Sequence, residues 1–302
     1  MKAAIISIGD ELLIGQTVNT NASWMGEQCT NSGISISQVL TISDNEQEIL
    51  DCLSYCQNKF ELVLITGGLG PTNDDITKKT IAKYLNVSLE QDSAVLENVK
   101  AFFKTFDSPV GHVNIEQANV PKGCTVLTNK VGTAPGMWIT KENTVFVSMP
   151  GVPREMKYLM QKEVLPKVSR EFKLSAIYSY NILTQGIGES FIAEKIVNIE
   201  NGLPQNIKLA YLPSQGTVKL RLTGRGKRLV EIESVVKKYA DDIVQNISEY
   251  VFGFKNDSLS GVVGELLSKK KLDICVAESI SGGLIAKEIA STPGASCYFK
   301  GG

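Results

Sequence analysis

The chain has 302 residues, of which 43% are hydrophobic and 21% are charged, and its formal net charge is -1. This composition is that of an ordinary soluble globular protein, and the length suggests two or three domains. No basic excess indicates a nucleic-acid partner, and no apolar run approaches the roughly 20 residues that a membrane span needs. The six cysteines are widely spaced, which is typical of reduced thiols and predicts a cytoplasmic protein.

Strand and helix signals alternate along the first half of the chain. The apolar runs AAIISIG, ISISQVLTI and ELVLITGG predict strands covered on both faces. Helices are predicted at residues 19–32 and over EQEILDCLSYCQ and DDITKKTIAKYLN, the last opened by aspartates. Two later strands (124–129 and 144–149) precede a closing helix with Pro153 in its first turn. The alternation predicts a doubly wound, mostly parallel α/β sheet over residues 1–172.

The composition changes after this unit. Residues 173–255 combine alternating strand patterns (AIYSYNILTQ, GTVKLRLT) with two helical patterns, which predicts a small α+β domain. Residues 256–302 read as helix, strand and helix. So short a piece cannot bury a good core alone, and we expect it to be the start of a further domain.

The stretch TGGLGPTNDDIT at residues 66–77 is the strongest chemical signal. Glycines after a strand let backbone N–H groups approach an anion, and the next helix adds its positive end. Neither the P-loop pattern nor G-x-G-x-x-G is present. Carboxylates in place of lysine would repel a phosphate unless a cation intervened, so the loop predicts Mg²⁺ between Asp74 or Asp75 and a phosphorylated ligand. The alternative is a tight turn with an aspartate N-cap.

Other acidic residues follow the neighbouring strands. Glu11 comes after the first strand and Asp44 after the second, while the turn MPGVP follows a later strand. The carboxyl ends of parallel strands gather at one edge of a sheet, where ligands bind in such folds. The pattern therefore predicts one carboxylate-lined crevice suited to metal-assisted chemistry on a phosphoester or phosphoanhydride.

Four motifs in order resemble the CinA family and its molybdopterin-binding fold: GDELLIGQTVNTNASW, TGGLGPTNDDIT, NKVGTAPGMW and MPGVPREM. The resemblance implies a metal-dependent hydrolase that cleaves ADP-ribose to AMP and ribose 5-phosphate, in pyridine nucleotide recycling. It also implies a nucleotide or pterin pocket, for which we expect these substrate-binding residues: Gly9, Asn21, Thr66, Gly67, Gly68, Gly70, Pro71, Thr72, Gly132, Pro135, Met149, Pro150 and Gly151.

The positions of the carboxylates after the strands, together with the family resemblance, also imply roles for them. Asp75, with Glu11 and Asp74, is expected to position the metal, and Asp44 to orient or deprotonate the attacking water. Mg²⁺ is the first candidate, with Co²⁺ or Mn²⁺ as alternatives and K⁺ as an additional cation. We expect a homodimer that binds a small nucleotide substrate and neither nucleic acid nor membrane.

The remaining two segments resemble later parts of the same family. Residues 173–255 are similar to a KH-like domain, but GIGES carries an acid where a nucleic-acid-binding loop would be basic, which favours a spacer or dimer contact. The start of residues 256–302 resembles a nicotinamide mononucleotide deamidase domain, in which Ser279 matches the nucleophile. A serine needs an activating base, so we expect Ser279 to be an inert remnant in this chain. Two alternatives stay open: deamidation by the complete protein, and a non-catalytic pterin- or nucleotide-binding module.

Overall fold

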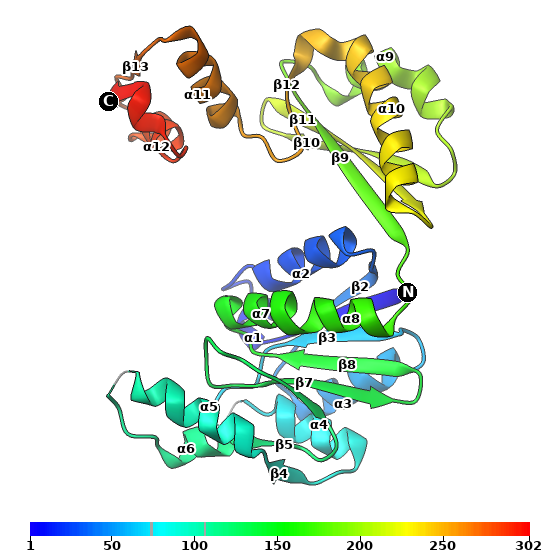
Figure 1. Cartoon of the computed structure of the whole chain (residues 1–302), viewed down its shortest axis with the longest axis vertical. Coiled ribbons are helices and arrows are strands. Elements are labelled where there is room, and N and C mark those ends of the chain that lie inside the picture. The colour runs from blue at the N-terminus through cyan, green and yellow to red at the C-terminus, as the bar shows by residue number, and fades with distance from the viewer. Residues whose placement is uncertain (73–74, 106) are drawn as a thin grey trace. The chain divides into compact units, whose positions relative to one another are not determined.

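The computed structural model describes residues 1–72, 75–105 and 107–302, so the predicted ligand Asp74 lies outside the described residues. The chain divides into two compact units, Met1–Ser175 and Ala176–Gly302 (Figure 1). The predicted boundary after residue 172 lies close to this division, and the predicted boundary after residue 255 stays a prediction. Within the described part of the chain, no helix has the length and apolarity required to cross a membrane.

A six-stranded sheet forms the centre of the first unit, in the order β2-β1-β3-β8-β7-β6. The pairs β1–β2, β1–β3 and β3–β8 are parallel, while β8–β7 and β7–β6 are antiparallel. The mostly parallel sheet is thus confirmed. Its strands are β1 (Lys2–Ile8), β2 (Ser35–Ile42), β3 (Leu62–Thr66), β6 (Thr125–Leu127), β7 (Gly136–Lys141) and β8 (Thr144–Met149).

Helices cover both faces of this sheet, as a doubly wound fold requires (Figure 1). On one face α2 (Thr20–Asn31), α7 (Pro153–Leu159) and α8 (Leu165–Glu171) pack against side chains such as Ile5 and Leu64. On the other face α3 (Glu46–Cys56) and α4 (Thr77–Leu85) pack against the alternate residues, such as Ile6 and Ile65. The continuous apolar runs of the central strands are explained by burial on both sides.

Shorter elements complete the first unit. The short helix α1 (Asp10–Leu13) directly follows β1. An excursion between α4 and β6 contains β4 (Leu89–Gln91), α5 (Ser93–Lys104), α6 (His112–Ile115), η1 (Glu116–Ala118) and β5 (Asn119–Pro121). The strands β4 and β5 pair with each other in a separate antiparallel sheet.

Local chemistry explains several helix boundaries. The Asn19 side chain accepts a hydrogen bond from the Ala22 amide at 3.0 Å, which caps the predicted helix at its start. The predicted closing helix begins at Pro153, as expected, and contains a π-helical stretch, Met160–Val164, between α7 and α8. Pro166 follows this stretch, and a wider turn accommodates a residue that lacks an N–H.

Several elements differ from the sequence prediction, which also lacked helix α5 and strand β10. The strand β7 was not predicted, because its apolar residues follow the GTAPG turn within a short segment. Helix α4 begins at Thr77, two residues after Asp75, and no side chain of a described residue caps it. The expectation that an aspartate opens this helix is therefore wrong for Asp75, whose carboxylate instead bonds to Thr72.

The second unit starts with an antiparallel sheet in the order β10-β11-β9-β12. Its strands are β9 (Ala176–Gln185), β10 (Ile207–Ser214), β11 (Thr217–Gly226) and β12 (Val251–Phe254). The helices α9 (Glu189–Asn201) and α10 (Leu229–Ile247) share a buried core with this sheet, and η3 (Ser248–Tyr250) follows α10. The last segment contains α11 (Leu259–Lys270), β13 (Ile274–Cys275), α12 (Leu284–Ala290), η4 (Ala295–Cys297) and β14 (Phe299–Gly301).

Candidate functional site

A cleft of about 390 Å³ lies at the carboxyl ends of the parallel strands. Most of the residues predicted for the site line it: Gly9, Glu11, Asp44, Gly67, Gly68, Gly70, Pro71, Asp75, Pro150 and Gly151. They come from the segments that directly follow β1, β2, β3 and β8, with Glu11 in α1. Loops that are distant in sequence therefore meet because the parallel strands end at the same edge of the sheet.

The conformation of the glycine loop after β3 requires glycine at two positions. Gly67 has φ +116°, and a Cβ there would lie 2.1 Å from the carbonyl oxygen of Ile8. Gly68 has φ +63°, and a Cβ there would lie 2.1 Å from Thr77 Oγ1 and 3.4 Å from Asp44 Oδ1. Both the backbone conformation and the close approach exclude larger residues. The loop is thus held tightly against the first strand and against the start of α4.

Asp44 is held in place by Asp10 on the neighbouring loop. The Asp10 amide donates to Asp44 Oδ2 at 3.3 Å, and the Asp44 amide donates to Asp10 Oδ1 at 3.4 Å. Partial burial is the main cause that raises the pKa of Asp44, and the Asp10 amide opposes it. The negative charges of Asp10, Glu11 and Asp75 raise the Asp44 pKa further. The cleft thus concentrates negative charge that a cation would relieve.

Asp75 folds back onto its own loop. Its Oδ2 accepts hydrogen bonds from the Thr72 amide at 3.0 Å and from Thr72 Oγ1 at 2.5 Å. The same oxygen would lie 2.4 Å from a Cβ on Gly70, so the carboxylate packs over that glycine. Asp75 therefore shapes the turn, without capping α4, and also lines the cleft.

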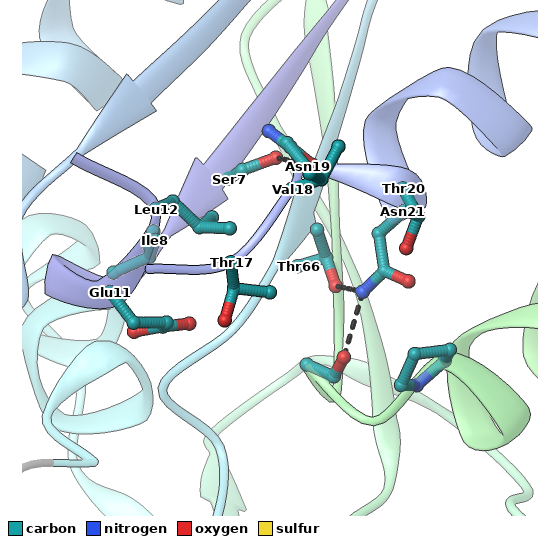
Figure 2. Close-up of a pocket in the computed structure, with 12 residues that line it drawn as sticks. Ser7, Ile8, Glu11, Leu12, Thr17, Val18, Asn19, Thr20, Asn21 and Thr66 are labelled. Carbon is teal, nitrogen blue, oxygen red and sulfur yellow. Dashed lines mark hydrogen bonds between the residues drawn. The ribbon is translucent and has the colours of Figure 1, made fainter. Parts of the chain in front are cut away.

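A smaller pocket of about 140 Å³ adjoins the cleft and shares Ile8, Glu11 and Gly151 with it. Figure 2 shows Asn21 directed toward Thr66, where its Nδ2 lies 3.3 Å from Thr66 Oγ1 and 2.7 Å from the Gly151 carbonyl oxygen. Among the described residues, the buried Asn21 Oδ1 has no hydrogen-bond partner. The pocket wall also carries the hydroxyls of Thr17 and Thr20, so it suits a hydroxyl-rich ligand group.

A third pocket, of about 230 Å³, lies beyond Asp75 and brings in two lysines that sequence reasoning missed. Lys78 Nζ donates to the carbonyl oxygens of Glu116 and Gln117 at 3.0 and 3.3 Å. The pKa of Lys78 is lowered to about 8, mainly by burial and also by the charge of Lys79, while the charge of Glu116 acts in the opposite direction. The loop thus has cationic neighbours, although the sequence places none where a P-loop would.

Gln117 forms part of the wall between the cleft and this third pocket. It is 2% exposed, and its Oε1 has no hydrogen-bond partner among the described residues. The excursion that carries it has no distinctive motif, so the sequence offered no signal for this residue.

Glu155 is a further carboxylate of the cleft that sequence reasoning missed. Burial raises its pKa, and the hydrogen bond from Asn129 Nδ2, at 2.5 Å, acts in the opposite direction. Glu155 lies in the first turn of α7, directly after the Met-Pro-Gly turn, and this position could have identified it.

Six of the predicted substrate-binding residues do not line the main cleft. Asn21 and Thr66 line the smaller pocket, and Thr72 lines the third. Gly132 packs beneath the Glu155 carboxylate, while Pro135 is buried and lines none of the three pockets. Met149 is buried as well, so its side chain belongs to the core, although its carbonyl oxygen accepts from the Gly67 amide at 3.2 Å.

The carboxylates of the cleft fit a hydrated metal ion better than one enclosed by protein ligands alone. Among the described residues, no group of three or more Asp, Glu, His or Cys side chains is arranged to enclose a metal ion. Mg²⁺ usually keeps several waters and binds one or two carboxylates together with substrate phosphates. Because Glu11, Asp44 and Asp75 line one cleft and their charges interact, the donors fit such a hydrated cation.

The predicted remnant nucleophile Ser279 lies on an exposed loop before α12. Its neighbour Glu278 accepts hydrogen bonds from Ser281 Oγ and from the amides of Ile285 and Ala286, at 2.6 to 2.9 Å. The bond from Ser281 is the main cause that lowers the pKa of Glu278. In the described part of the chain the Ser279 hydroxyl has no acid or base hydrogen-bonded to it, so its activation stays without a structural basis.

Sequence comparisons place each segment of the chain in a known family. Residues 4–170 match the family described as "Probable molybdopterin binding domain". Residues 179–253 match "Damage-inducible protein CinA KH domain", and residues 256–302 match "CinA C-terminal domain". A "CinA-like protein" of Flavobacterium psychrophilum is 48% identical over 303 residues, which cover all of this chain and 72% of that protein. One of Cytophaga hutchinsonii is 42% identical, covering 99% of this chain and 72% of its own length.

Solved structures resemble about half of the chain. A structure of "the protein CinA with unknown function" from Thermoplasma acidophilum is 30% identical, with a TM-score of 0.49, and covers 56% of this chain and 96% of its own. A tungsten cofactor synthesizing protein MoaB from Pyrococcus furiosus is 17% identical, with a TM-score of 0.37, and covers 56% of this chain and 91% of its own. On the family matches and on the identity to relatives of which it covers 72%, this chain belongs to the CinA family.

Proposed function

We propose that the first unit hydrolyses ADP-ribose to AMP and ribose 5-phosphate with a divalent cation, Mg²⁺ by ligand type. The observation that carries the proposal is the meeting of Glu11, Asp44 and Asp75 around one glycine-lined cleft. Backbone amides of the glycine loop suit phosphate oxygens, whereas the carboxylates need a cation before a phosphate can approach them. The proposed role is in the recycling of pyridine nucleotides, and Co²⁺ or Mn²⁺ are alternative metals.

The arrangement of the pockets also supports a substrate with two halves. The smaller pocket shares three residues with the cleft, and the third pocket shares Gly70, Pro71, Asp75 and Gln117 with it. A pyrophosphate in the cleft would leave one sugar for the pocket of Asn21 and a nucleoside for the pocket of Lys78. Two lysines beyond Asp75 would attract such an anionic ligand toward the glycine loop.

The proposed chemistry uses residues from three loops. Glu11 and Asp75 would hold the cation, which would neutralise charge on the pyrophosphate. Asp44 would accept a proton from the attacking water, since it is held by the Asp10 amide at the edge of the cleft. The water oxygen forms a bond to one phosphorus, and the bridging P–O bond breaks. The leaving phosphate keeps the electron pair, and the proton passes from Asp44 to solvent.

Single substitutions of the carboxylates test this assignment. Asp75→Asn keeps an oxygen that can accept from Thr72 but removes the charge, and Asp44→Asn removes the proposed base. We expect Asp44→Asn to lower AMP release by roughly 10²–10⁴-fold, the usual contribution of a positioned base, and Asp75→Asn to abolish metal-dependent release. Asp51→Asn, on the exposed surface of α3, is the matched control and should retain full turnover. Folded variants of Asp44 and Asp75 with undiminished turnover would refute the assignment.

Two further measurements distinguish the alternative functions from ADP-ribose hydrolysis. ADP-ribose that binds without AMP release would favour a non-catalytic nucleotide- or pterin-binding module. Conversion of nicotinamide mononucleotide, lost in Ser279→Ala, would favour the deamidase. The homodimer and the additional K⁺ stay predictions from the family resemblance.

A further inference from the structure

The acidic side chains of residues 176–254, a stretch that the structure describes in full, are confined to one layer. Every Asp and Glu of this stretch lies in α9, α10 or η3. The four strands of the sheet carry none, and they hold only basic charges. These are Lys208 on β10 and Lys219, Arg221 and Arg225 on β11.

Strand alternation places all four basic side chains on the same face of the sheet. Val218, Leu220 and Leu222 of β11 are buried in the core shared with α10, so the residues between them point to the opposite face. Lys219, Arg221 and Arg225 are exposed there. Lys208 pairs with Thr223, which alternates with Leu222, and therefore joins the same face. We call these four residues the basic sheet face.

The basic sheet face is not neutralised within the described residues. The ion pairs of this stretch lie elsewhere: Lys195 with Glu249, Arg228 with Glu231 and Lys237 with Glu233. None of the four basic side chains forms an ion pair or a side-chain hydrogen bond with a described residue. Four uncompensated charges on one flat face create a local positive potential that the net charge of the whole chain conceals.

Aromatic rings are absent from this face on β10 and β11, both of which are fully described. Tyr211, the aromatic residue of these two strands, pairs with Leu220 and donates its hydroxyl to Glu200 of α9. It therefore belongs to the helix side of the sheet. Binding to single-stranded bases usually relies on aromatic stacking, and the reading of duplex bases needs an element that enters a groove. Basic strands without rings on this face fit a phosphate backbone alone.

We propose that the basic sheet face binds the phosphodiester backbone of a nucleic acid without reading its sequence. The proposal is independent of the function proposed for the first unit. It departs from the expectation that the chain has no nucleic-acid partner, which rested on the net charge and on the acid in GIGES. The binding face lies on the side of the sheet opposite α9 and α10, so that acid, Glu189 at the start of α9, does not enter the argument.

The test measures salt-dependent binding of the full chain to labelled oligonucleotides. A single strand and a duplex of one sequence, and a second duplex of scrambled sequence, are titrated by fluorescence anisotropy between about 25 and 200 mM salt. Each phosphate contact contributes about -0.7 to the log–log salt slope for a single strand and about -0.9 for a duplex. Four contacts predict a slope of about -3 to -4, and equal affinity for the two duplexes. The slope and the affinities show which nucleic acid supplies the backbone.

Neutral substitutions locate the binding to this face. Lys219→Gln and Arg221→Gln should each reduce the slope by about one contact, and the double variant by about two. Lys238→Gln, on the exposed surface of α10, removes the same charge from the other layer and should leave the slope unchanged. Circular dichroism establishes that the variants are folded.

Three results would overturn the proposal. The first is the absence of binding to any oligonucleotide at the lowest salt, and the second is equal loss of binding in Lys238→Gln and in the sheet variants. The third is a preference for another anionic partner: tighter binding to phosphatidylserine vesicles, or self-association of the chain that the sheet variants abolish. Either would assign the basic sheet face to a membrane or to the acidic helix layer of a second copy.

Discussion

Replacement of Gly68 by alanine tests the packing of the glycine loop. At φ +63° a non-glycine residue costs about 1 kcal/mol or somewhat more, because its Cβ crowds the following carbonyl. The new methyl would also lie 2.1 Å from Thr77 Oγ1, and overpacking of this kind costs about 1–3 kcal/mol. Gly68→Ala should therefore lower the free energy of unfolding by about 2–4 kcal/mol.

Tryptophan fluorescence during urea denaturation measures this effect in the first unit alone, because both tryptophans, Trp24 and Trp138, lie in it. Gly15→Ala is the matched control: Gly15 has φ +74°, but no atom lies within 4 Å of the position that its new methyl would take, so only the backbone cost of about 1 kcal/mol should appear. The double variant Gly68→Ala/Thr77→Ala should recover part of the loss. Equal effects at Gly15 and Gly68 would refute the reasoning about the loop.

Two further predictions concern residues that sequence reasoning missed. Since the pKa of Lys78 falls from 10.5 to about 8 on folding, the unfolded chain binds more protons between these values, and stability should rise as pH increases from about 8 to 10.5. This rise, up to ~3 kcal/mol, should be missing in Lys78→Met when both proteins are unfolded with urea across that range, and an identical pH dependence would contradict the burial of the charge. Asn129→Ala should cost about 1–3 kcal/mol, because Asn129 is 1% exposed and donates to the Ala134 carbonyl and to Glu155. A loss below about 0.5 kcal/mol in the same assay, the level of an ordinary surface substitution, would show that this network does not hold the loop.

The parallel core of the sheet could be predicted from the sequence because its strands are buried on both faces. In a chain where strand and helix signals alternate, an uninterrupted apolar run as short as that of β1 is typical of a strand between two helix layers. The strand β7 was not predicted, since a six-residue strand after a glycine-proline turn carries a weak periodic signal. Its antiparallel pairing with β8 depends on tertiary contacts that no local pattern specifies.

The residues of the candidate site could be predicted where a carboxylate follows a recognisable strand. Glu11, Asp44 and Asp75 each follow a recognisable strand, and the structure brings them to one cleft. Gln117 lies in an excursion without a motif, and Lys78 is separated from it by 39 positions in the sequence. Their proximity is a property of the folded chain.

The net charge of the chain did not predict how charge is distributed in the second unit, because this distribution also depends on the fold. A total near zero is compatible with a sheet face that carries only positive charges and a helix layer that carries all the negative ones. The alternation of Lys219 and Arg221 with buried residues was present in the sequence. The lack of acidic neighbours around them became evident only once the strands were aligned in register.

The central claim is most directly tested by incubating the purified chain with ADP-ribose and Mg²⁺ and measuring AMP and ribose 5-phosphate by chromatography. We predict equimolar release of the two products, abolished by EDTA and restored by Mg²⁺, Mn²⁺ or Co²⁺. If the folded chain releases no AMP with any of these metals, the proposed hydrolysis is contradicted.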